Sequence, residues 1–492
     1  MAVTAGIDCG TQSTKVLCYD SVTKKVLAKA TSLHTLISKD DGSREQKAQW
    51  YIDAIVDCFQ QIPSQIKEQI EGLGVSGQQH GFVPLDKDGQ PIATVKLWCD
   101  TSTADQCEYL TEKLGGKDKV FALIGNQILP GYTASKVVAL KQNDAKTYAK
   151  LAHILLPHDY INYFLTGNFV MEKGDASGTA FFDVRNQCWS KEVLHAMDEE
   201  HDLSLMLPRL ISEKETAGTV TASTAKLLGL NSHVIVSCGG GDNMMGAIGC
   251  GCTEEGSLVM SMGTSGTLFG FSHTCITDSK ERLAAFMASS GGYLPLLCTM
   301  NFTVVSEQIR QVLGLDVSQF DTLAASAPAG ANGVMMLPYF NGERTPNYPH
   351  GEAVMAGMNV GNTSQANMAR AALESAVFGM KGGLEAFLEQ GFCAKKLLIT
   401  GGGSNSKVWA QIVSDIFSLP VEIPSMKESA AFGGALQVLS LIDHKTIQEE
   451  TKIHQNIAED NKYYPQAETK ILYEKAYAKY KKYDTQLAPL FR

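Results

Sequence analysis

The chain has 492 residues, which is too many for one hydrophobic core, because single cores stop growing near about 250 to 300 residues. We therefore expect two large domains. Hydrophobic residues make up 44% of the chain and charged residues 19%, which argues against a disordered or fibrous protein. The net charge of −10 disfavours nucleic acid and anionic membranes as partners and favours a small-molecule substrate.

The twelve cysteines are scattered, with no CxxC pair and no spacing typical of a zinc site. This pattern predicts reduced thiols, mostly buried, in a cytoplasmic protein. The first residues, MAVTAGIDCG, have no basic segment followed by an apolar one, so we expect no secretion signal. No apolar run reaches the roughly 18 residues of a membrane-spanning helix.

In the first half of the chain, residues 3–20 alternate in polarity around a Gly-Thr-Gln-Ser turn, which predicts a β-hairpin. Residues 48–70 follow a helical pattern. A strand is predicted at 73–77, leading into Gln78, Gln79, His80 and Gly81. Residues 118–165 are expected to be mainly helical, and the Gly- and Asp-rich segment 173–179 to interrupt that helical region.

In the second half, a buried strand is predicted at 233–238, followed by Gly239-Gly240-Gly241-Asp242-Asn243 and a helix of small residues. Residues 257–271 repeat the N-terminal hairpin pattern. Both hairpins carry Gly-Thr-x-x-Thr, at 10–14 and 263–267, which is a weak internal repeat and suggests two halves that begin alike.

Further along, residues 366–390 predict a helix and 397–400 a strand. The turn at 401–405 then leads into another helix, with Ser404 or Asn405 as its N-cap. Residues 440–492 are charged and helical and are expected to lie across the surface. Strands alternating with helices predict an α/β fold, which we divide into domains 1–245 and 246–492.

The two hairpins are the best candidates for binding phosphate. The single Gly-Lys pair, Gly116-Lys117, lacks the rest of a P-loop, and Gly72, Gly74 and Gly77 match GxGxxG only within a strand. Two glycine turns facing each other would instead present backbone N–H groups and hydroxyls to a polyphosphate. The expected contacts are Gly10, Thr11, Ser13, Gly263, Thr264 and Ser265. Asp8 could hold Mg²⁺, directly or through water. The alternative is two ordinary surface hairpins, with Asp8 capping a turn.

These residues resemble known motifs. The segment from Asp8 to Lys15 resembles the first phosphate motif of the actin-like ATPase superfamily, and residues 262–265 resemble the second. Residues 401–405 resemble the adenosine motif. Residues 353–374 and 131–143 resemble the two signatures of the FGGY carbohydrate kinases, except that Ala139 stands where that family usually has Trp. The resemblance implies two actin-like (ribonuclease H-like) domains, with ATP, Mg²⁺ and a sugar bound in a cleft between them. It assigns the nucleotide to the hairpins, Lys15, Gly401, Gly402, Gly403 and Asn405.

Within the family, residues 76–81 resemble the substrate loop of xylulose kinases, as do the Trp98-Cys-Asp100 element and residues 175–179. The resemblance implies phosphorylation of D-xylulose and sugar contacts from Gln79, His80, Trp98, Asp100, Asp242 and Asn243. It also raises the expectation of a homodimer. Ser102 stands where bacterial relatives commonly carry Arg, so ribulose, gluconate, sedoheptulose and glycerol stay open as substrates. A non-enzymatic actin-like nucleotide switch is the alternative from another class.

Transfer of a phosphoryl group to a sugar hydroxyl requires a group that accepts the hydroxyl proton. Asp242 follows a predicted strand at the end where ligands of α/β sheets bind, and the resemblance assigns it the role of catalytic base, with Asp8 the next candidate. The alternative for Asp242 is the N-cap of the following helix. Lys15 could equally be a solvated side chain. The segment from Asn341 to Pro346 resembles a family loop near the cleft, and we assign it no role.

Overall fold

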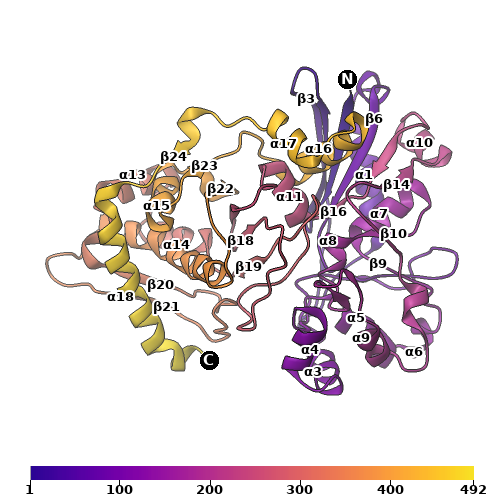
Figure 1. Ribbon diagram of the computed structural model, residues 1–492. Helices are drawn as coiled ribbons and strands as arrows, with labels where there is room; N and C mark the ends of the chain where they lie inside the picture. The colour runs from indigo at the N-terminus through magenta and orange to yellow at the C-terminus, as the bar shows by residue number, and fades with distance from the viewer. Residues whose placement is uncertain (1) are drawn as a thin grey trace.

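The computed structural model describes residues 2–492 and contains two mixed sheets (Figure 1). In the first sheet the strand order is β3-β2-β1-β6-β15-β14, and β16 also pairs with β6. Strands β1, β2 and β3 form an antiparallel meander, whereas β6 lies parallel to β1 and β15 parallel to β6. The bounds are β1 Val3–Cys9, β2 Ser13–Asp20, β3 Lys25–Leu33, β6 Ile70–Gly77, β14 Thr216–Thr219, β15 Ile235–Ser237 and β16 Gly240–Gly241.

The second sheet repeats this topology. Its order is β19-β18-β17-β22-β23-β24, again an antiparallel meander followed by two parallel strands and an antiparallel edge. The predicted internal repeat and the α/β class with two actin-like domains are therefore confirmed. The bounds are β17 Ser257–Met262, β18 Gly266–Gly270, β19 Leu296–Thr299, β22 Lys396–Thr400, β23 Val421–Glu422 and β24 Lys462–Tyr463.

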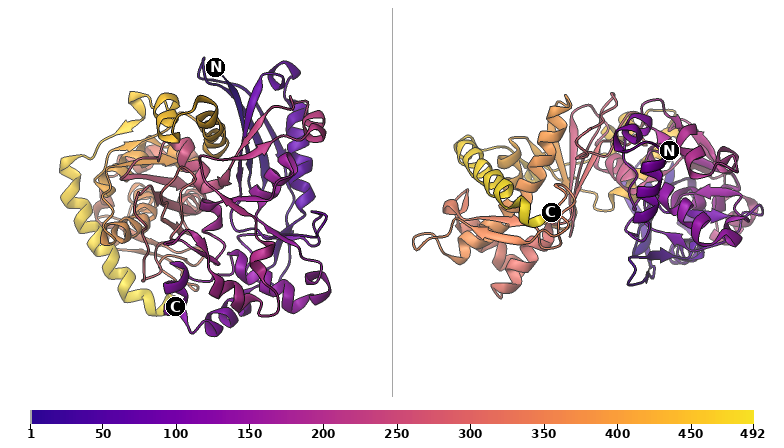
Figure 2. Two further views of the ribbon diagram at one scale, coloured as in Figure 1. Left: turned by 45° about the vertical axis from the view of Figure 1, so that its right-hand side comes forward. Right: turned by 90° about the horizontal axis from the view of Figure 1, so that it is seen from below.

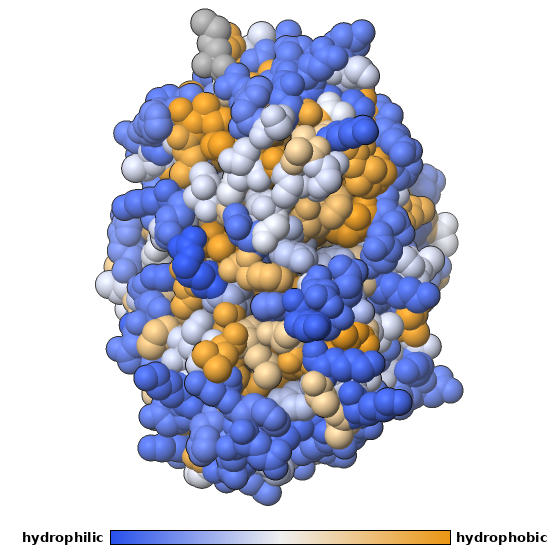
Figure 3. Space-filling view, turned by 90° about the vertical axis from the view of Figure 1, so that its right-hand side faces the viewer, coloured by the Kyte–Doolittle hydropathy of each residue, from blue (hydrophilic) through white to orange (hydrophobic). Residues whose placement is uncertain are grey.

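Helices cover both faces of each sheet. On the first sheet, α1 (Ala48–Gln61), α7 (Pro157–Thr166) and α10 (Ala222–Leu228) share a core with β1, β6 and β15. On the second, α12 (Thr303–Val312), α13 (Val317–Ser326), α14 (Gln365–Glu389), α15 (Lys407–Phe417) and α18 (Ala467–Phe491) share a core with β17, β18 and β22. Hydrophilic residues cover both ends of the outer face of the first domain, with separate hydrophobic patches between them (Figure 3).

Two helices connect the domains. Helix α11 (Asp242–Cys250) packs Met244 and Ala247 with Val259, Phe269 and Leu398 of the second sheet. Its other side packs against α16 (Ser429–Asp443), which lies on β1, β2 and β6 of the first sheet. Figure 2 shows the two lobes joined at this region. Residues 429–443 thus pack with the first sheet although they lie between β23 and β24 of the second in sequence. The division at residues 245/246 stays a prediction.

Glycines make the contact between α16 and the first sheet possible. A Cβ at Gly74 would overlap the carbonyl of Gly434, and a Cβ at Gly6 would overlap that of Ala431. Gly72 and Gly74 of the GxGxxG run therefore serve packing, because they let α16 approach β6 closely. This role is consistent with the prediction that the run is not a nucleotide-binding motif.

A long connection also crosses between the domains. Residues 271–295 leave β18, run against the first domain and return as β19. The side chain of Asn126 donates to and accepts from the backbone of Ala285, both at 2.7 Å, and the Ser289 hydroxyl donates to Glu172 at 2.9 Å. We call residues 271–295 the strap. It couples the edge of the second sheet to the interior of the first domain.

Local expectations are mostly confirmed, with two corrections. The expected interruption at 173–179 itself contains a short helix, α8 (Lys173–Ala176), whose first turn is capped by the Glu172 carboxylate. The N-cap of α15 is Ser406, whose hydroxyl accepts from the N–H of Trp409, rather than Ser404 or Asn405. Residues 402–405 form a 3₁₀ turn before it, which moves the helix start by one to two residues.

The remaining elements surround these cores. The other helices are α2 Ser64–Lys67, α3 Ala104–Lys113, α4 Lys117–Ile124, α5 Thr133–Asn143, α6 Ala145–Tyr148, α9 Lys191–Met197 and α17 Ile447–His454. Small sheets pair β4 Ile37–Ser38, β5 Arg44–Gln46 and β8 Val95–Lys96; β7 Val83–Leu85 and β9 His153–Leu155; β10 Val170–Glu172 and β13 Arg209–Ile211; β11 Phe182–Asp183 and β12 Cys188–Trp189; and β20 Met335–Pro338 and β21 Ala353–Ala356. No helix within residues 2–492 is long and apolar enough to cross a bilayer. All twelve cysteines are unpaired, and seven are buried.

Candidate active site

The carboxyl ends of three neighbouring strands bring the two predicted carboxylates to one edge of the first sheet. Asp8 near the end of β1 is in register with Ser76 of β6, and Ser76 is in turn in register with Gly240 of β16. The Ser76 hydroxyl donates to Oδ1 of Asp8 at 3.0 Å. Asp242 follows Gly240 by two residues, so it stands at the same edge, where open α/β sheets bind ligands.

Asp242 does not cap its helix. The N-cap of α11 is Gly241, and Asp242 is already the first helical residue. Its Oδ1 accepts from the N–H of Asn243 at 2.8 Å and from the Asn243 amide at 3.1 Å. Burial, reinforced by the negative charges of Asp8 and Asp175, raises the pKa of Asp242 to about 7. A carboxylate with a pKa near neutrality is suited to accept a proton at physiological pH.

Burial also raises the pKa of Asp8, while Lys15 and the Ser76 hydroxyl oppose the rise. Lys15 is the register partner of Asp8 on β2 and is exposed. Two carboxylates in electrostatic contact at one sheet edge favour a divalent cation, because its charge offsets their repulsion. Carboxylate oxygen is also the ligand that Mg²⁺ prefers. The donor chemistry at Asp8 therefore fits the predicted Mg²⁺.

The first phosphate hairpin is held by a network of buried amides. The Thr11 hydroxyl donates to Gln78 at 3.1 Å and accepts from the indole N–H of Trp98 at 3.0 Å, while Gln46 donates to the Thr11 carbonyl at 2.8 Å. The N–H of Gly10 bonds the Ser13 carbonyl at 3.0 Å, which closes the turn. These bonds fix the backbone that would face a phosphate.

Gly10 is not required for the backbone conformation of its turn, although a glycine at a tight turn suggests such a requirement. Its φ is not positive, and a Cβ there would meet only the Ser13 carbonyl oxygen, at an ordinary 3.5 Å. The fold itself thus tolerates a side chain at this position. The remaining physical reason for glycine is space for a ligand against the backbone.

The second hairpin and the predicted adenosine turn lie side by side, because β17 and β22 are parallel neighbours with Ser261 opposite Thr400. Gly401 has φ +87°, and a Cβ there would press on the backbone of Met262, just before Gly263. Thr264 and Ser265 are exposed, and a Cβ at Gly402 would meet nothing within 4 Å. Gly403 is buried against Met262, whereas Asn405 is exposed and its amide donates to the Gly402 carbonyl at 3.0 Å.

The predicted sugar loop joins the base through one amide pair. Asn243 donates to Oε1 of Gln79 at 2.9 Å and also bonds Asp242, so it bridges the two. The Gln79 Nε2 is buried without a hydrogen-bond partner among residues 2–492. A buried, unpaired amide donor next to a carboxylate predicted to act as the base is a site where a substrate hydroxyl could bind.

His80 adopts a left-handed backbone conformation with φ +66°. Its ring packs edge-on against Tyr132, with ring centroids 4.7 Å apart, and lies 5.6 Å from Phe286 of the strap. Burial lowers its pKa well below the usual range, so the ring is neutral at pH 7. Its Nδ1 forms no hydrogen bond of good geometry in the described part of the chain, although the backbone of Gly178 is close enough to oppose the fall in its pKa.

Sequence reasoning missed Lys136, a fully buried lysine on α5. Its ammonium donates to the carbonyl of His80 at 2.8 Å and to that of Gly131 at 2.6 Å. The Thr133 hydroxyl donates to the same His80 carbonyl at 3.2 Å. Burial lowers the pKa of Lys136 to about 7. Helix α5 therefore fixes the strained backbone of the sugar loop. The one sequence signal was a lysine inside the signature at 131–143.

Trp98 and Asp100 differ in exposure to solvent. Trp98 is 38% exposed, beside Thr11. The Asp100 side chain is fully buried, and its oxygens accept from the N–H of Arg44, from Lys96 and from the backbone and hydroxyl of Ser102. In this structure Asp100 therefore braces the loop, and its oxygens are occupied by the protein's own donors. Ser102, the departure from the family pattern, belongs to this brace.

A buried ionic cluster that acts electrostatically on Asp242 was also missed. Nδ1 of His158 donates to Asp175 at 2.6 Å, and its Nε2 lies 3.0 Å from Asp159, all three side chains being fully buried. The carboxylates on both sides raise the pKa of His158 to about 9. Asp175 in turn contributes to the raised pKa of Asp242. Segments 157–159 and 172–175 meet only in the folded chain, so no local pattern could predict the cluster.

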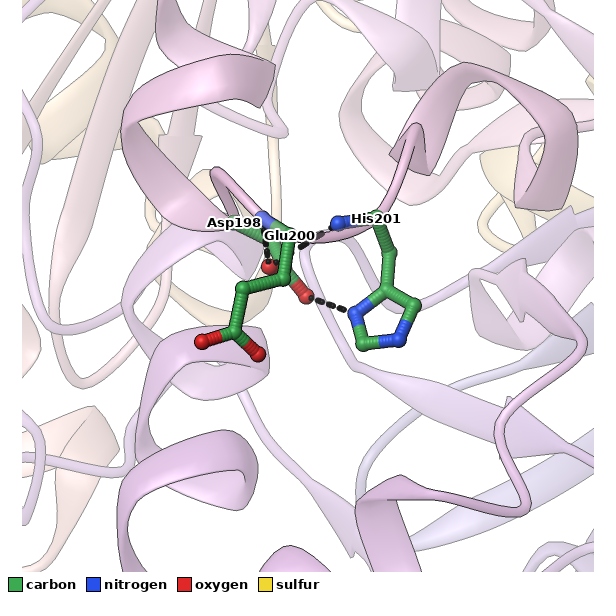
Figure 4. Close-up of side chains that lie close together, drawn as sticks. All are labelled: Asp198, Glu200 and His201. Carbon is green, nitrogen blue, oxygen red and sulfur yellow. Dashed lines mark hydrogen bonds and ion pairs between the residues drawn. The ribbon is translucent and has the colours of Figure 1, made fainter.

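A second polar cluster has the residue types of a metal site, but the oxygens of its aspartate are already occupied by hydrogen bonds. Asp198, Glu200 and His201 are the only such group within residues 2–492 (Figure 4). Asp198 already accepts from Lys141 and Tyr148, each at 2.6 Å, and from His201 at 3.0 Å, so its lone pairs are taken. In Figure 4 no dashed line reaches the Glu200 carboxylate, which bonds neither of the other two side chains.

Known carbohydrate kinases resemble this chain over nearly its whole length. Residues 3–249 match the model of the FGGY family of carbohydrate kinases, N-terminal domain, and residues 258–440 match the C-terminal domain. The chain is 41% identical over 491 residues to a xylulose kinase of Haemophilus influenzae, covering 98% of this chain and 99% of the relative.

Two crystal structures extend the comparison. A "xyloylose kinase" from Brucella ovis superposes with a TM-score of 0.91 at 26% identity, covering 99% of this chain and all of the other. A gluconate kinase from Lactobacillus acidophilus superposes with a TM-score of 0.90 at 21% identity, covering 100% of this chain and 99% of the other. The second likeness concerns the fold alone.

Proposed function

The chain belongs to the FGGY family of carbohydrate kinases, and on that premise we propose that it transfers the γ-phosphoryl group of ATP to D-xylulose, giving D-xylulose 5-phosphate and ADP. The relatives named above support the choice of sugar. The observation that carries the proposed chemistry is the Asp242–Asn243–Gln79 bridge, which connects a carboxylate of pKa about 7 to the predicted sugar loop.

In the proposed reaction, Asp242 accepts the proton of the sugar hydroxyl as that oxygen attacks phosphorus. Asn243 holds the Asp242 carboxylate at Oδ1 and turns Gln79 toward the same space. Gln79 Nε2 and His80 Nδ1, both buried and unpaired among the described residues, would each bind a sugar hydroxyl. The position of the sugar thus follows from groups that already need partners.

The nucleotide is assigned to the two hairpins and the turn at 401–405. Backbone N–H groups near Gly10 and Gly263 and the hydroxyls of Thr264 and Ser265 would bind phosphate oxygens, and the open position at Gly402 leaves room for the nucleoside. A Mg²⁺ ion, when bound, would neutralise phosphate charge. Asp8 is the residue that would hold it, and Ser76 orients the Asp8 carboxylate.

Another sugar or polyol is the main alternative, because the same fold occurs in a gluconate kinase and because Ser102 departs from the family pattern. A panel of D-xylulose, ribulose, gluconate, sedoheptulose and glycerol in a coupled ADP-release assay decides between them. The proposal expects kcat/KM to be highest for D-xylulose. A higher value for any other acceptor contradicts the proposed substrate. Absence of sugar-stimulated ADP release with every acceptor would favour a nucleotide switch.

A homodimer stays a prediction of the family resemblance, and a cytoplasmic location stays a prediction of the cysteine pattern. Sedimentation of the purified chain, with and without sugar, would test the first.

A further inference from the structure

The proposed site has more negative than positive charge close to it. Asp8 and Asp242 stand at the sheet edge, Asp175 lies beneath them, and the whole chain carries a net charge of −10. A polyphosphate adds further negative charge. Of the lysines near the site, Lys136 is fully buried and occupied by two carbonyls, and Lys15 is exposed on β2. The proposed Mg²⁺ at Asp8 would offset part of this charge, and a side-chain cation that reaches the phosphoryl group would offset more of it.

The loop between β20 and β21 carries an arginine, Arg344, in a turn that is held rigidly. Glu343, only 6% exposed, turns its carboxylate inward. It accepts from the N–H of Met300 at 2.6 Å, from the N–H of Arg344 at 2.7 Å and from the amide of Asn301 at 3.1 Å. A buried carboxylate with three donors fixes the backbone next to Arg344, as a catalytic constellation requires.

Asn301 adds a second clamp on the same loop. Its amide donates to the Gly342 carbonyl at 2.6 Å, and its side-chain oxygen accepts from the N–H of Asn341 at 3.1 Å. The loop is therefore attached on both sides of Glu343 to the residues that directly follow β19. An ordinary solvent-facing turn needs no such anchoring, because water satisfies its backbone groups.

The segment that anchors Arg344 also contacts the second phosphate hairpin. The N–H of Phe302 donates to the Thr264 carbonyl, and that of Thr303 to the Gly263 carbonyl, both at 2.9 Å. Residues 300–303 thus bear the arginine loop on one side and the hairpin on the other. This chain of hydrogen bonds connects the loop that carries Arg344 to the hairpin assigned to phosphate.

The Arg344 side chain is exposed and acts electrostatically on the first domain. Its positive charge helps to lower the pKa of His80 in the sugar loop and acts on the adjacent Tyr132. It acts as well on Cys298 of β19, which feels the charge of Asp242 too. One guanidinium therefore acts on the predicted sugar loop of the first domain, and its own loop is anchored to the segment that bonds the hairpin of the second.

We propose that Arg344 is a further catalytic residue, which contacts the phosphoryl group while it passes from the nucleotide to the sugar. The inference rests on the proposed function. In the step, the sugar oxygen forms a bond to the γ-phosphorus and the bond from that phosphorus to the β,γ-bridging oxygen breaks. That oxygen leaves with the electron pair on ADP, and the hydroxyl proton goes to Asp242. The planar guanidinium donates to two phosphoryl oxygens at once, where charge accumulates.

The test compares Arg344→Gln with Arg209→Gln, a matched change at an exposed arginine on β13 that pairs with Glu215. Calorimetry measures the binding of ADP·Mg²⁺ with and without aluminium fluoride, which mimics the phosphoryl group in transfer. We expect Arg344→Gln to weaken the fluoroaluminate complex at least about 100-fold and to leave binding of ADP·Mg²⁺ within about twofold of wild type. Arg209→Gln should change neither.

Turnover gives the second readout. Arg344→Gln should lower kcat by about 10²- to 10³-fold with little change in the KM for sugar, and Arg344→Lys should recover part of the loss because it keeps the charge without the fork. Equal fluoroaluminate affinity in wild type and Arg344→Gln overturns the inference. So does a rise in sugar KM with unchanged kcat, which would make Arg344 a sugar-binding residue. If wild type phosphorylates no sugar, the proposed function fails, and the fluoroaluminate comparison still shows whether Arg344 binds a phosphoryl mimic.

Discussion

Replacing Asp242 by Asn is the most informative single change, because Asn keeps the size of the side chain and its bond with the N–H of Asn243 but cannot accept a proton. Loss of a general base lowers turnover typically about 10²- to 10⁴-fold, which corresponds to about 3 to 5.5 kcal/mol in the activation barrier. We expect kcat to fall by that factor while ATP binding is retained.

The same substitution has a predictable effect on stability. The unfolded chain releases the Asp242 proton near the ordinary pKa of 3.8, whereas the folded protein keeps it up to about pH 7. Between these two pKa values the folded state binds more protons at Asp242 than the unfolded state does. The protonation equilibrium of Asp242 therefore lowers the free energy of unfolding as the pH rises from about 4 to about 7, and the loss is constant above about pH 7. The full penalty corresponds to about 4 kcal/mol and is smaller in practice because solvent reaches the side chain.

Asp242→Asn lacks this penalty. Its melting temperature should equal that of wild type near pH 4 and exceed it at pH 8. Differential scanning calorimetry at both pH values, together with the coupled ADP assay, measures the two effects on one preparation. Retention of more than about a tenth of wild-type turnover would refute the role of base, and Asp8→Asn would be tested next. A variant that is less stable than wild type at pH 8 would refute the electrostatic part of the reasoning.

Four other outcomes follow from the structure. Gly10→Ala should weaken ATP·Mg²⁺ binding without lowering the melting temperature, since the fold leaves room for a Cβ there; unchanged affinity would remove the first hairpin from the nucleotide site. Lys136→Met removes the Lys136 donor from the Gly131 carbonyl and leaves the His80 carbonyl with the Thr133 hydroxyl alone, at a cost of about 1 to 3 kcal/mol, so the KM for sugar should rise tenfold or more while that for ATP stays constant. Equal changes in both KM values would contradict a specific role in the sugar loop. Asp175→Asn removes a negative charge that raises the pKa of Asp242, so the acidic limb of kcat/KM, near pH 7 in wild type, should move to lower pH; an unmoved limb would exclude this coupling. Small-angle scattering should show compaction when sugar is added, because transfer to a sugar must exclude water, and identical profiles would argue against domain closure.

The parts of this fold that were predictable from sequence are those set by local patterns. The two Gly-Thr hairpins, the strand before Asp242 and the helix at 365–389 each carry their signal within a short window. The repeated hairpin even indicated the repeated topology. The start of α15 and the position of Asp242 within α11 were not resolved by sequence, because Ser, Asn, Asp and Gly are all good N-caps and several occur in a row.

The packing between the domains could not be predicted. The small residues of α16 would allow close contact with either sheet. No local sequence pattern indicates that this helix packs on the first sheet. Lys136 was missed because lysine is almost never fully buried. His158 and Asp175 are 17 residues apart and become an ion pair only through the fold. Arg344 was noticed but given no role, since its value depends on buried Glu343 and on contacts 40 residues away.

The most direct test of the account is phosphorus NMR of wild-type protein incubated with ATP, Mg²⁺ and D-xylulose. The account predicts that the γ-phosphate signal of ATP disappears while ADP and a sugar phosphomonoester accumulate in equal amounts, the ester coupled to the protons of carbon 5. Release of inorganic phosphate alone, or an unchanged ATP spectrum at saturating D-xylulose, would contradict it.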